Sequence, residues 1–185
     1  MKTSRHIWIR TGYERFGKGG TNALLVEQLA QTVGKSKSSF YHHFGSTEIF
    51  LEALFEVHRE RVLELAEKEN QARGLFPDLV LVLSQHANDL LFSRSLRIQR
   101  MHPGFEALIQ WSDEQIGPGF LALWQREVEH LFSIGQIQSF LKIALDNFYL
   151  QMTPESISTQ WLNQYLMDMR IQLAVLARRP LDGSV

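Results

Sequence analysis

The 185-residue sequence contains no cysteine, which excludes a disulfide framework, a thiolate metal site and a cysteine nucleophile. It also lacks an apolar run of the roughly 18 residues that a bilayer-spanning helix needs. Its N-terminus lacks the apolar core and the small-residue cleavage site of a secretory signal. These absences predict a cytoplasmic protein with no membrane segment. Apolar residues make up 44% of the chain, so a folded core is expected rather than disorder.

The net charge is only −1, but the charges are unevenly distributed. Residues 1–45 contain seven Lys or Arg and two acidic residues, a net charge of +5, whereas the remaining 140 residues contain twelve and eighteen, a net charge of −6. This asymmetry favours attraction of a polyanion to the N-terminal end. The alternative is an ordinary solvated basic face.

The segment from Leu29 to Phe44 predicts two short helices joined at Gly34, because glycine tolerates the left-handed backbone of a tight helix end. A small residue at Ala30, a glycine four positions later and Phe40 six beyond it match helix-turn-helix spacing. The alternative is an ordinary helical hairpin. The outer face and the turn carry polar groups that can reach phosphate or base edges, and these are the predicted DNA contacts: Lys35, Ser36, Lys37, Ser38, Ser39, Tyr41 and His42.

The N-terminal sequence resembles the DNA-binding module of the TetR family of bacterial transcriptional regulators over about residues 5–65. The resemblance depends on Phe16, Gly20, Val26, Leu29, Ala30, Gly34, Ser36, the segment Phe40-Tyr41-His42-His43-Phe44, and Glu48. It implies an all-helical dimer in which a long helix links the DNA-binding domain to a ligand-sensing domain.

Four departures from the family pattern concern DNA contacts. Leu24 and Leu25 replace a threonine pair, Lys35 replaces an apolar turn residue, Ser38 replaces a glycine, and Thr47 replaces a lysine. The affinity for DNA and the operator sequence therefore stay open.

We predict an all-α fold of about nine helices, with a three-helix DNA-binding domain at residues 1–46 and a linking helix plus C-terminal domain at residues 47–185. The long linking helix is expected from about Thr47 to Gln71. Beyond it we expect one apolar helix over 75–92, a short helix over 105–111, a turn at 117–119 and a helix over 120–134. Two final helices are expected over about 136–152 and 155–178.

The last two helices carry more large apolar side chains than one packed face requires, which predicts a homodimer formed by a four-helix bundle. Burial within the subunit is the alternative. The predicted interface residues are Phe140, Phe148, Ile157, Trp161, Tyr165, Met169 and Leu173.

A small-molecule pocket is expected between the C-terminal helices, because pockets combine aromatic walls with a few polar groups. The candidate lining residues, which would otherwise be plain core, are Phe92, His102, Phe105, Trp111 and Trp124. Glu127 and His130 match a di-iron ligand pair but lack the second copy and the extra carboxylates that such a site needs. No metal, cofactor or enzymatic activity is predicted.

The sequence therefore predicts a TetR-like regulator, expected to be a repressor, that binds a palindromic operator in double-stranded DNA as a homodimer and releases it when a small-molecule effector binds. Two alternatives stay open. One is a dimeric ligand-binding or scaffolding module that has lost DNA binding, and the other is an enzyme or carrier with an accessory basic head.

Overall fold

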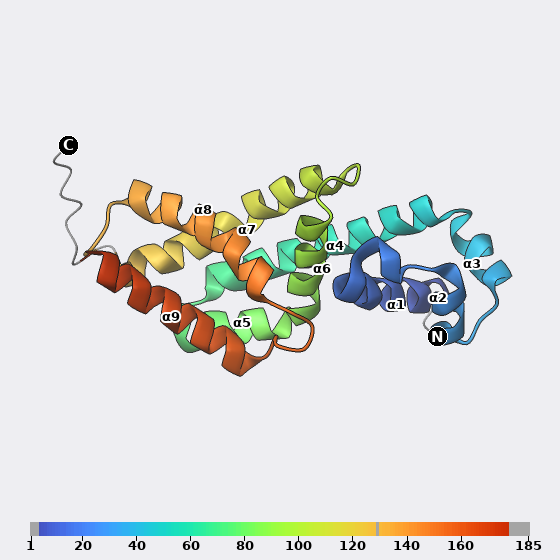
Figure 1. Cartoon of the computed structure of the whole chain (residues 1–185), viewed down its shortest axis with the longest axis horizontal. Helices are drawn as coiled ribbons and strands as arrows, with labels where there is room; N and C mark the ends of the chain where they lie inside the picture. The colour runs from blue at the N-terminus through green and yellow to red at the C-terminus, as the bar shows by residue number, and fades with distance from the viewer. Residues whose placement is uncertain (1–3, 129, 178–185) are drawn as a thin grey trace.

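The computed structural model describes residues 4–128 and 130–177, which form an elongated molecule of nine α-helices and two short helical turns (Figure 1). This confirms the predicted all-α fold. The elements are α1 (Ser4–Gly19), η1 (Gly20–Ala23), α2 (Val26–Val33), α3 (Lys37–Phe44), α4 (Thr47–Gln71), η2 (Leu75–Leu79), α5 (Val80–Gln85), α6 (Ala87–Ile98), α7 (Phe105–Val128), α8 (Ile134–Gln151) and α9 (Thr159–Ala177).

Helices α1, α2 and α3 gather at one end of the molecule, with α8 and α9 at the other (Figure 1). Fully buried aromatic side chains hold the first group together: the Trp8 ring meets the Phe40 ring edge to face at 5.4 Å between centroids, and Phe40 meets Phe50 at 5.0 Å. Helix α1 approaches α4 closely at Gly12, where a Cβ atom would lie 2.3 Å from the Phe50 ring. Glycine is therefore required at this contact.

Helix α4 has the predicted bounds and runs from the α3 end toward the α9 end of the molecule (Figure 1). Ser46 caps it, since its side-chain oxygen accepts a hydrogen bond from the Ile49 backbone N–H at 3.3 Å. The helix contributes Phe50 and Leu54 to the N-terminal core and Leu65 to the C-terminal core. It therefore joins the two cores as one continuous element.

The predicted turn at 117–119 is wrong, because α7 continues through it with Pro118 inside the helix. Proline removes one helical hydrogen bond, which leaves the carbonyl of Glu114 without its partner four residues on. Both residues are exposed, so water can satisfy that carbonyl. Gly119 faces inward, where a Cβ atom would lie 3.0 Å from the Asn70 Oδ1 atom. The glycine thus permits close packing of α7 on α4 instead of a chain reversal.

The single apolar helix predicted over 75–92 is also wrong, since this segment forms η2, α5 and α6. The break between α5 and α6 falls at His86, whose backbone leaves helical geometry (φ −102°, ψ 21°). Its ring turns inward and hydrogen-bonds to Asp89. Side-chain hydrogen bonding thus overrides the apolar pattern of the sequence.

The last two helices lie close to their predicted positions. Helix α8 begins with a capping box between Ser133 and Gln136, and α9 begins four residues later than predicted because Ser158 caps it at the Trp161 N–H. Arg178, the predicted end of α9, lies outside the described residues. Within residues 4–128 and 130–177, no helix combines the length and the apolar character needed to cross a membrane.

Candidate nucleic-acid interface and effector cavity

The turn between α2 and α3 has the geometry of a helix-ending Schellman motif. Gly34 takes the left-handed conformation (φ 67°, ψ 38°), the Lys35 N–H donates to the Ala30 carbonyl at 3.0 Å, and the Gly34 N–H donates to the Gln31 carbonyl at 3.2 Å. Ser36 then caps α3 by accepting a hydrogen bond from the Ser39 N–H at 3.2 Å. Local hydrogen bonds thus end α2 at Gly34 and begin α3 at Ser36.

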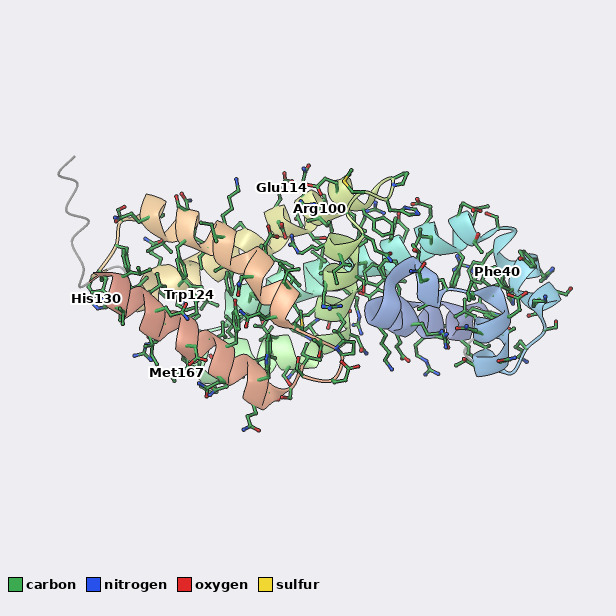
Figure 2. All side chains as sticks on the ribbon, viewed as in Figure 1. Phe40, Arg100, Glu114, Trp124, His130 and Met167 are labelled. Atoms are coloured by element: carbon green, nitrogen blue, oxygen red, sulfur yellow. The ribbon has the colours of Figure 1, made fainter. Side chains whose placement is uncertain are left out.

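Helix α3 separates a buried face from a polar outer face. Phe40, labelled in Figure 2, is fully buried and Phe44 is 3% exposed. Of the seven predicted DNA-contacting residues, Ser39 is half-buried and the rest are exposed: Lys35, Ser36, Lys37, Ser38, Tyr41 and His42. The structure therefore brings all seven to one end of the molecule, on the turn and the outward side of α3.

Lys37 forms an ion pair with Glu27 of α2, with 2.8 Å between Nζ and Oε1. The hydrogen bond between them raises the pKa of Lys37 and lowers that of Glu27. Both side chains are more than half exposed, so solvent screens the pair strongly. The ammonium group can therefore exchange this carboxylate for a phosphate.

The structure also places the departures from the family pattern. Leu24 is buried in the N-terminal core, whereas Leu25 is 52% exposed and occupies the N-cap position of α2 without providing a side-chain acceptor. Thr47, at the start of α4, is exposed. A threonine at position 25 would place a hydroxyl group at that cap.

The predicted dimer residues, six on α8 and α9 and Ile157 in the segment between these helices, face mostly inward. Phe148, Met169 and Leu173 are buried within the chain, and Phe140, Ile157, Trp161 and Tyr165 are half-buried. Other apolar side chains of these two helices are at least half exposed: Ile134, Ile143, Leu150, Ile171, Val175 and Leu176. The apolar excess is thus present, but different residues carry its outward part.

A narrow cavity lies among the C-terminal helices and reaches the side of α4. Its wall is mainly aliphatic and aromatic, with Glu69 as its one carboxyl group among the described lining residues: Leu65, Glu69, Leu83, Leu90, Ile116, Phe120, Ala144, Leu145, Phe148, Tyr149, Tyr165, Leu166 and Met169. A cleft of about 260 Å³ between α7 and α8 shares four of these side chains, so the two spaces adjoin.

None of the five predicted pocket residues lines this cavity. Phe92 and Phe105 are fully buried in the N-terminal core, and Trp111 packs against that core. His102 is exposed and contacts the Phe105 ring. Trp124, at the opposite end of the molecule from Phe40 in Figure 2, is buried in the C-terminal core. The cavity therefore indicates a different lining set.

A buried hydrogen-bond network that the sequence analysis missed joins α1, α4 and α6. The Tyr13 hydroxyl donates to Asp89 Oδ1 at 2.9 Å and lies 2.8 Å from His58 Nδ1, while His86 Nδ1 lies 2.7 Å from Asp89 Oδ2. Ser93 Oγ lies 3.3 Å from His58 Nε2. The tautomers follow from this donor order: each histidine carries its proton on Nδ1 and accepts at Nε2.

Burial dominates the titration of this network. It lowers the pKa of His58 to about 3, because a fully buried imidazole resists protonation. Burial, followed by the negative charge of Asp89, raises the pKa of Tyr13 well above its ordinary value. Both groups therefore stay neutral near pH 7, with Tyr13 donating its hydrogen bond to Asp89 and His58 bonded to the Tyr13 hydroxyl.

The Glu127–His130 pair has a different environment from a metal site. The Glu127 carboxylate pairs with Arg170 Nε at 2.8 Å, and His130 is exposed. Across the described parts of the chain, no group of three or more His, Cys, Asp or Glu side chains could hold a metal ion.

The N-terminal part of the chain matches a known protein family. Residues 9–54 match the family described as bacterial regulatory proteins of the tetR family, which confirms the resemblance found in the N-terminal sequence. A comparison with curated protein sequences gave no match.

The fold of the whole chain is similar to solved regulators. A TetR-family transcriptional regulator from Streptomyces coelicolor aligns with a TM-score of 0.57 and 16% identity over 99% of this chain and 93% of that one. The ketosteroid transcriptional regulator KstR2 of Mycobacterium tuberculosis aligns with a TM-score of 0.57 and 14% identity over 95% of each chain. At these identities the likeness shows the fold.

Proposed function

We propose that this chain, which carries the TetR-family helix-turn-helix module within a TetR-type fold, is a transcriptional repressor that binds a palindromic DNA operator as a homodimer and is released by a small molecule. The observation that carries the proposal is the outer face of α3. Its exposed lysine, serine, tyrosine and histidine side chains lie opposite two buried phenylalanines. Phosphate contacts would supply most of the affinity, and two or three side chains would read bases in the major groove.

A homodimer is supported by the apolar side chains that α8 and α9 leave in solvent, notably Ile143, which is 76% exposed, and Leu150, which is 66% exposed. They are seven residues apart on α8, so they share one face. A four-helix bundle made from α8 and α9 of two subunits would cover them. It would also hold two α3 helices at the fixed separation that a palindrome requires.

Effector control is supported by the cavity beside α4. A ligand that prefers one arrangement of the C-terminal helices shifts the protein toward that arrangement, in proportion to its differential affinity for the two states. Because α4 carries residues of both cores, its movement would alter the position of α3. KstR2 is described as a ketosteroid regulator, and we expect a small hydrophobic effector here as well.

Selection of binding sites from a random double-stranded DNA library would test the proposal. We expect an inverted repeat whose half-sites are one helical turn apart, about 34–36 Å centre to centre. Binding should weaken steeply with salt, because phosphate contacts release counterions.

The residues on α3 are tested by Lys37→Ala combined with Tyr41→Ala, with Arg126→Ala as the control for loss of an exposed cation elsewhere. We expect the double variant to lose about tenfold or more in affinity for the selected DNA and the control to lose none. Unchanged affinity in the double variant would remove α3 from the proposal. Failure to select any sequence would favour a module that has lost DNA binding.

A further inference from the structure

Glu69 is unusual for a buried acidic side chain. It is 1% exposed, and neither carboxyl oxygen has a hydrogen-bond partner among the described residues. Burial raises its pKa to about 8. Buried polar groups in folded proteins are nearly always hydrogen-bonded, and each exception requires an explanation.

The position of Glu69 provides an explanation for its missing hydrogen bonds. Its side chain forms part of the wall of the cavity. The other described lining residues have aliphatic or aromatic side chains, two of which are tyrosines. The aromatic side chains of the same wall are Phe120, Phe148, Tyr149 and Tyr165. Glu69, without a hydrogen-bond partner, is thus the one carboxyl group among the described lining residues of a mainly apolar cavity.

We propose that Glu69 is the ion-pair partner of a protonated amine on a hydrophobic effector, which names the ligand class for the effector site of the proposed function and rests on it. An ionised carboxylate only accepts hydrogen bonds, and a primary ammonium group donates up to three. Aromatic faces around it add cation–π attraction. No lysine or arginine lines the described wall of the cavity, so an acidic ligand would face Glu69 without a countercharge.

The adjoining cleft provides a route for the rest of the ligand. Ile116, Phe120, Leu145 and Tyr149 line both spaces, so an apolar tail can extend from the cavity between α7 and α8. Among the charged groups of the cleft, Asp113 pairs with Arg97, whose guanidinium lies 4.4 Å from the centroid of the Tyr149 ring, and Lys142 is exposed. The cavity beside Glu69 has a volume of only about 30 Å³, enough for a small head group, so the apolar body of an amine ligand would lie in the cleft of about 260 Å³.

The pocket also contacts the helix that joins the two cores. Gly119 of α7 packs beside Glu69, where a Cβ atom would lie 3.4 Å from the Glu69 Cβ atom. His58 of the buried network lies eleven residues earlier on α4, three helical turns away. A cation drawn to Glu69 therefore acts on α4 itself.

Three compounds with one skeleton and different head groups test the proposal on the full chain: 4-phenylbutylamine, 4-phenylbutan-1-ol and 4-phenylbutyrate. Isothermal titration calorimetry should show the amine binding about tenfold or more tightly than the alcohol, since hydrogen bonds between charged groups are the stronger ones. The acid should bind more weakly than the alcohol. An alcohol that binds as tightly as the amine, or an acid that binds more tightly than either, would overturn the proposal without any variant.

Glu69→Gln sharpens the test, because it keeps the shape of the side chain and removes its charge. We expect it to abolish the preference for the amine while leaving the affinity for the alcohol within about threefold. Glu67→Gln, an exposed neighbour on α4, is the matched control and should retain the preference. Thermal unfolding of each variant checks that the fold is intact. An amine preference that survives in Glu69→Gln would contradict the assignment.

Operator release separates this proposal from the one on which it rests. Fluorescence anisotropy with the selected DNA measures release at saturating 4-phenylbutylamine. If the amine is preferred but DNA stays bound, the amine site stands and effector control fails. If the chain binds its operator and other compounds release it while the head-group series shows no preference for the amine, the regulator stands and the amine site fails.

Discussion

Asp89 and Glu69 are both buried carboxyl groups, and their surroundings differ. Asp89 accepts hydrogen bonds from Tyr13 and His86 and has Arg61 Nε at 3.8 Å. Glu69 accepts none from the described residues. A buried carboxylate with partners holds elements together, whereas a buried carboxyl group without partners destabilises the fold until a ligand pairs with it. Asp89 thus belongs to a structural joint, whereas Glu69 belongs to the binding site proposed above.

The largest effect is expected from Asp89→Ala, which removes the group on which the network converges. The Tyr13 hydroxyl and the His86 ring lose their acceptor while staying buried. We expect the free energy of unfolding to fall by about 3–5 kcal/mol, as when one partner of a buried pair is removed. Urea unfolding at a fixed protein concentration measures it.

Glu52→Ala is the control for Asp89→Ala, since Glu52 is an exposed carboxylate on α4. Its effect should stay within about 0.5 kcal/mol. A loss below about 1 kcal/mol in Asp89→Ala, the size of one ordinary hydrogen bond, would show that the network does not hold the helices together.

The next effect is a pH dependence from His58, whose pKa is lowered from 6.5 to about 3 in the folded chain. Below pH 6.5 His58 binds a proton in the unfolded chain but stays neutral in the folded chain. The stability contributed by neutral His58 is therefore present above pH 6.5 and is lost as the pH falls toward 3, by about 1.4 kcal/mol per pH unit. His58→Gln should remove this part of the slope in urea unfolding between pH 6.5 and 4.5.

Substitution of exposed His42 is the control, since His42→Gln should leave the slope unchanged. An identical slope in wild type and His58→Gln would mean that the buried ring takes up its proton without cost to the fold.

An effect of the opposite sign is expected at Glu69, whose pKa is raised from 4.5 to about 8. The unfolded chain releases this proton above pH 4.5, so stability is lost as the pH rises toward 8. Glu69→Leu should raise the free energy of unfolding by about 1–3 kcal/mol at pH 8, because it removes an unpaired buried polar group. The gain should shrink at pH 5, where the carboxyl group is neutral in the folded chain. A loss of stability at pH 8 would indicate that Glu69 has a partner.

The two carboxyl groups differ from the helix-turn-helix in how well the sequence predicts them. The turn at Gly34 depends on backbone hydrogen bonds to residues within four positions, so spacing alone predicted it. The network joins Tyr13 to residues 45 and 76 positions away. Such pairings depend on how α1, α4 and α6 pack, which no local pattern encodes.

A signal for Glu69 was nevertheless present in the sequence. Exposed glutamates recur every four residues along α4, from Glu48 to Glu60. Glu69 instead follows Val62 and Leu65 at helical spacing, on the buried side of the same helix. An acid on an apolar stripe predicts burial. The long-range packing that also surrounds it with Phe120 and Tyr149 became visible only in the structure.

The smallest effect is expected at the edge of the network, from Ser93→Ala. Ser93 Oγ lies 3.3 Å from His58 Nε2, the longest contact of the set, and the ring keeps its bond to Tyr13 when this hydroxyl is removed. One buried ring nitrogen then lacks a donor, so we expect a loss of about 1 kcal/mol in urea unfolding. A loss as large as that of Asp89→Ala would mean that the network is cooperative throughout. Its polar groups would then act as a unit rather than through separate contacts to one carboxylate.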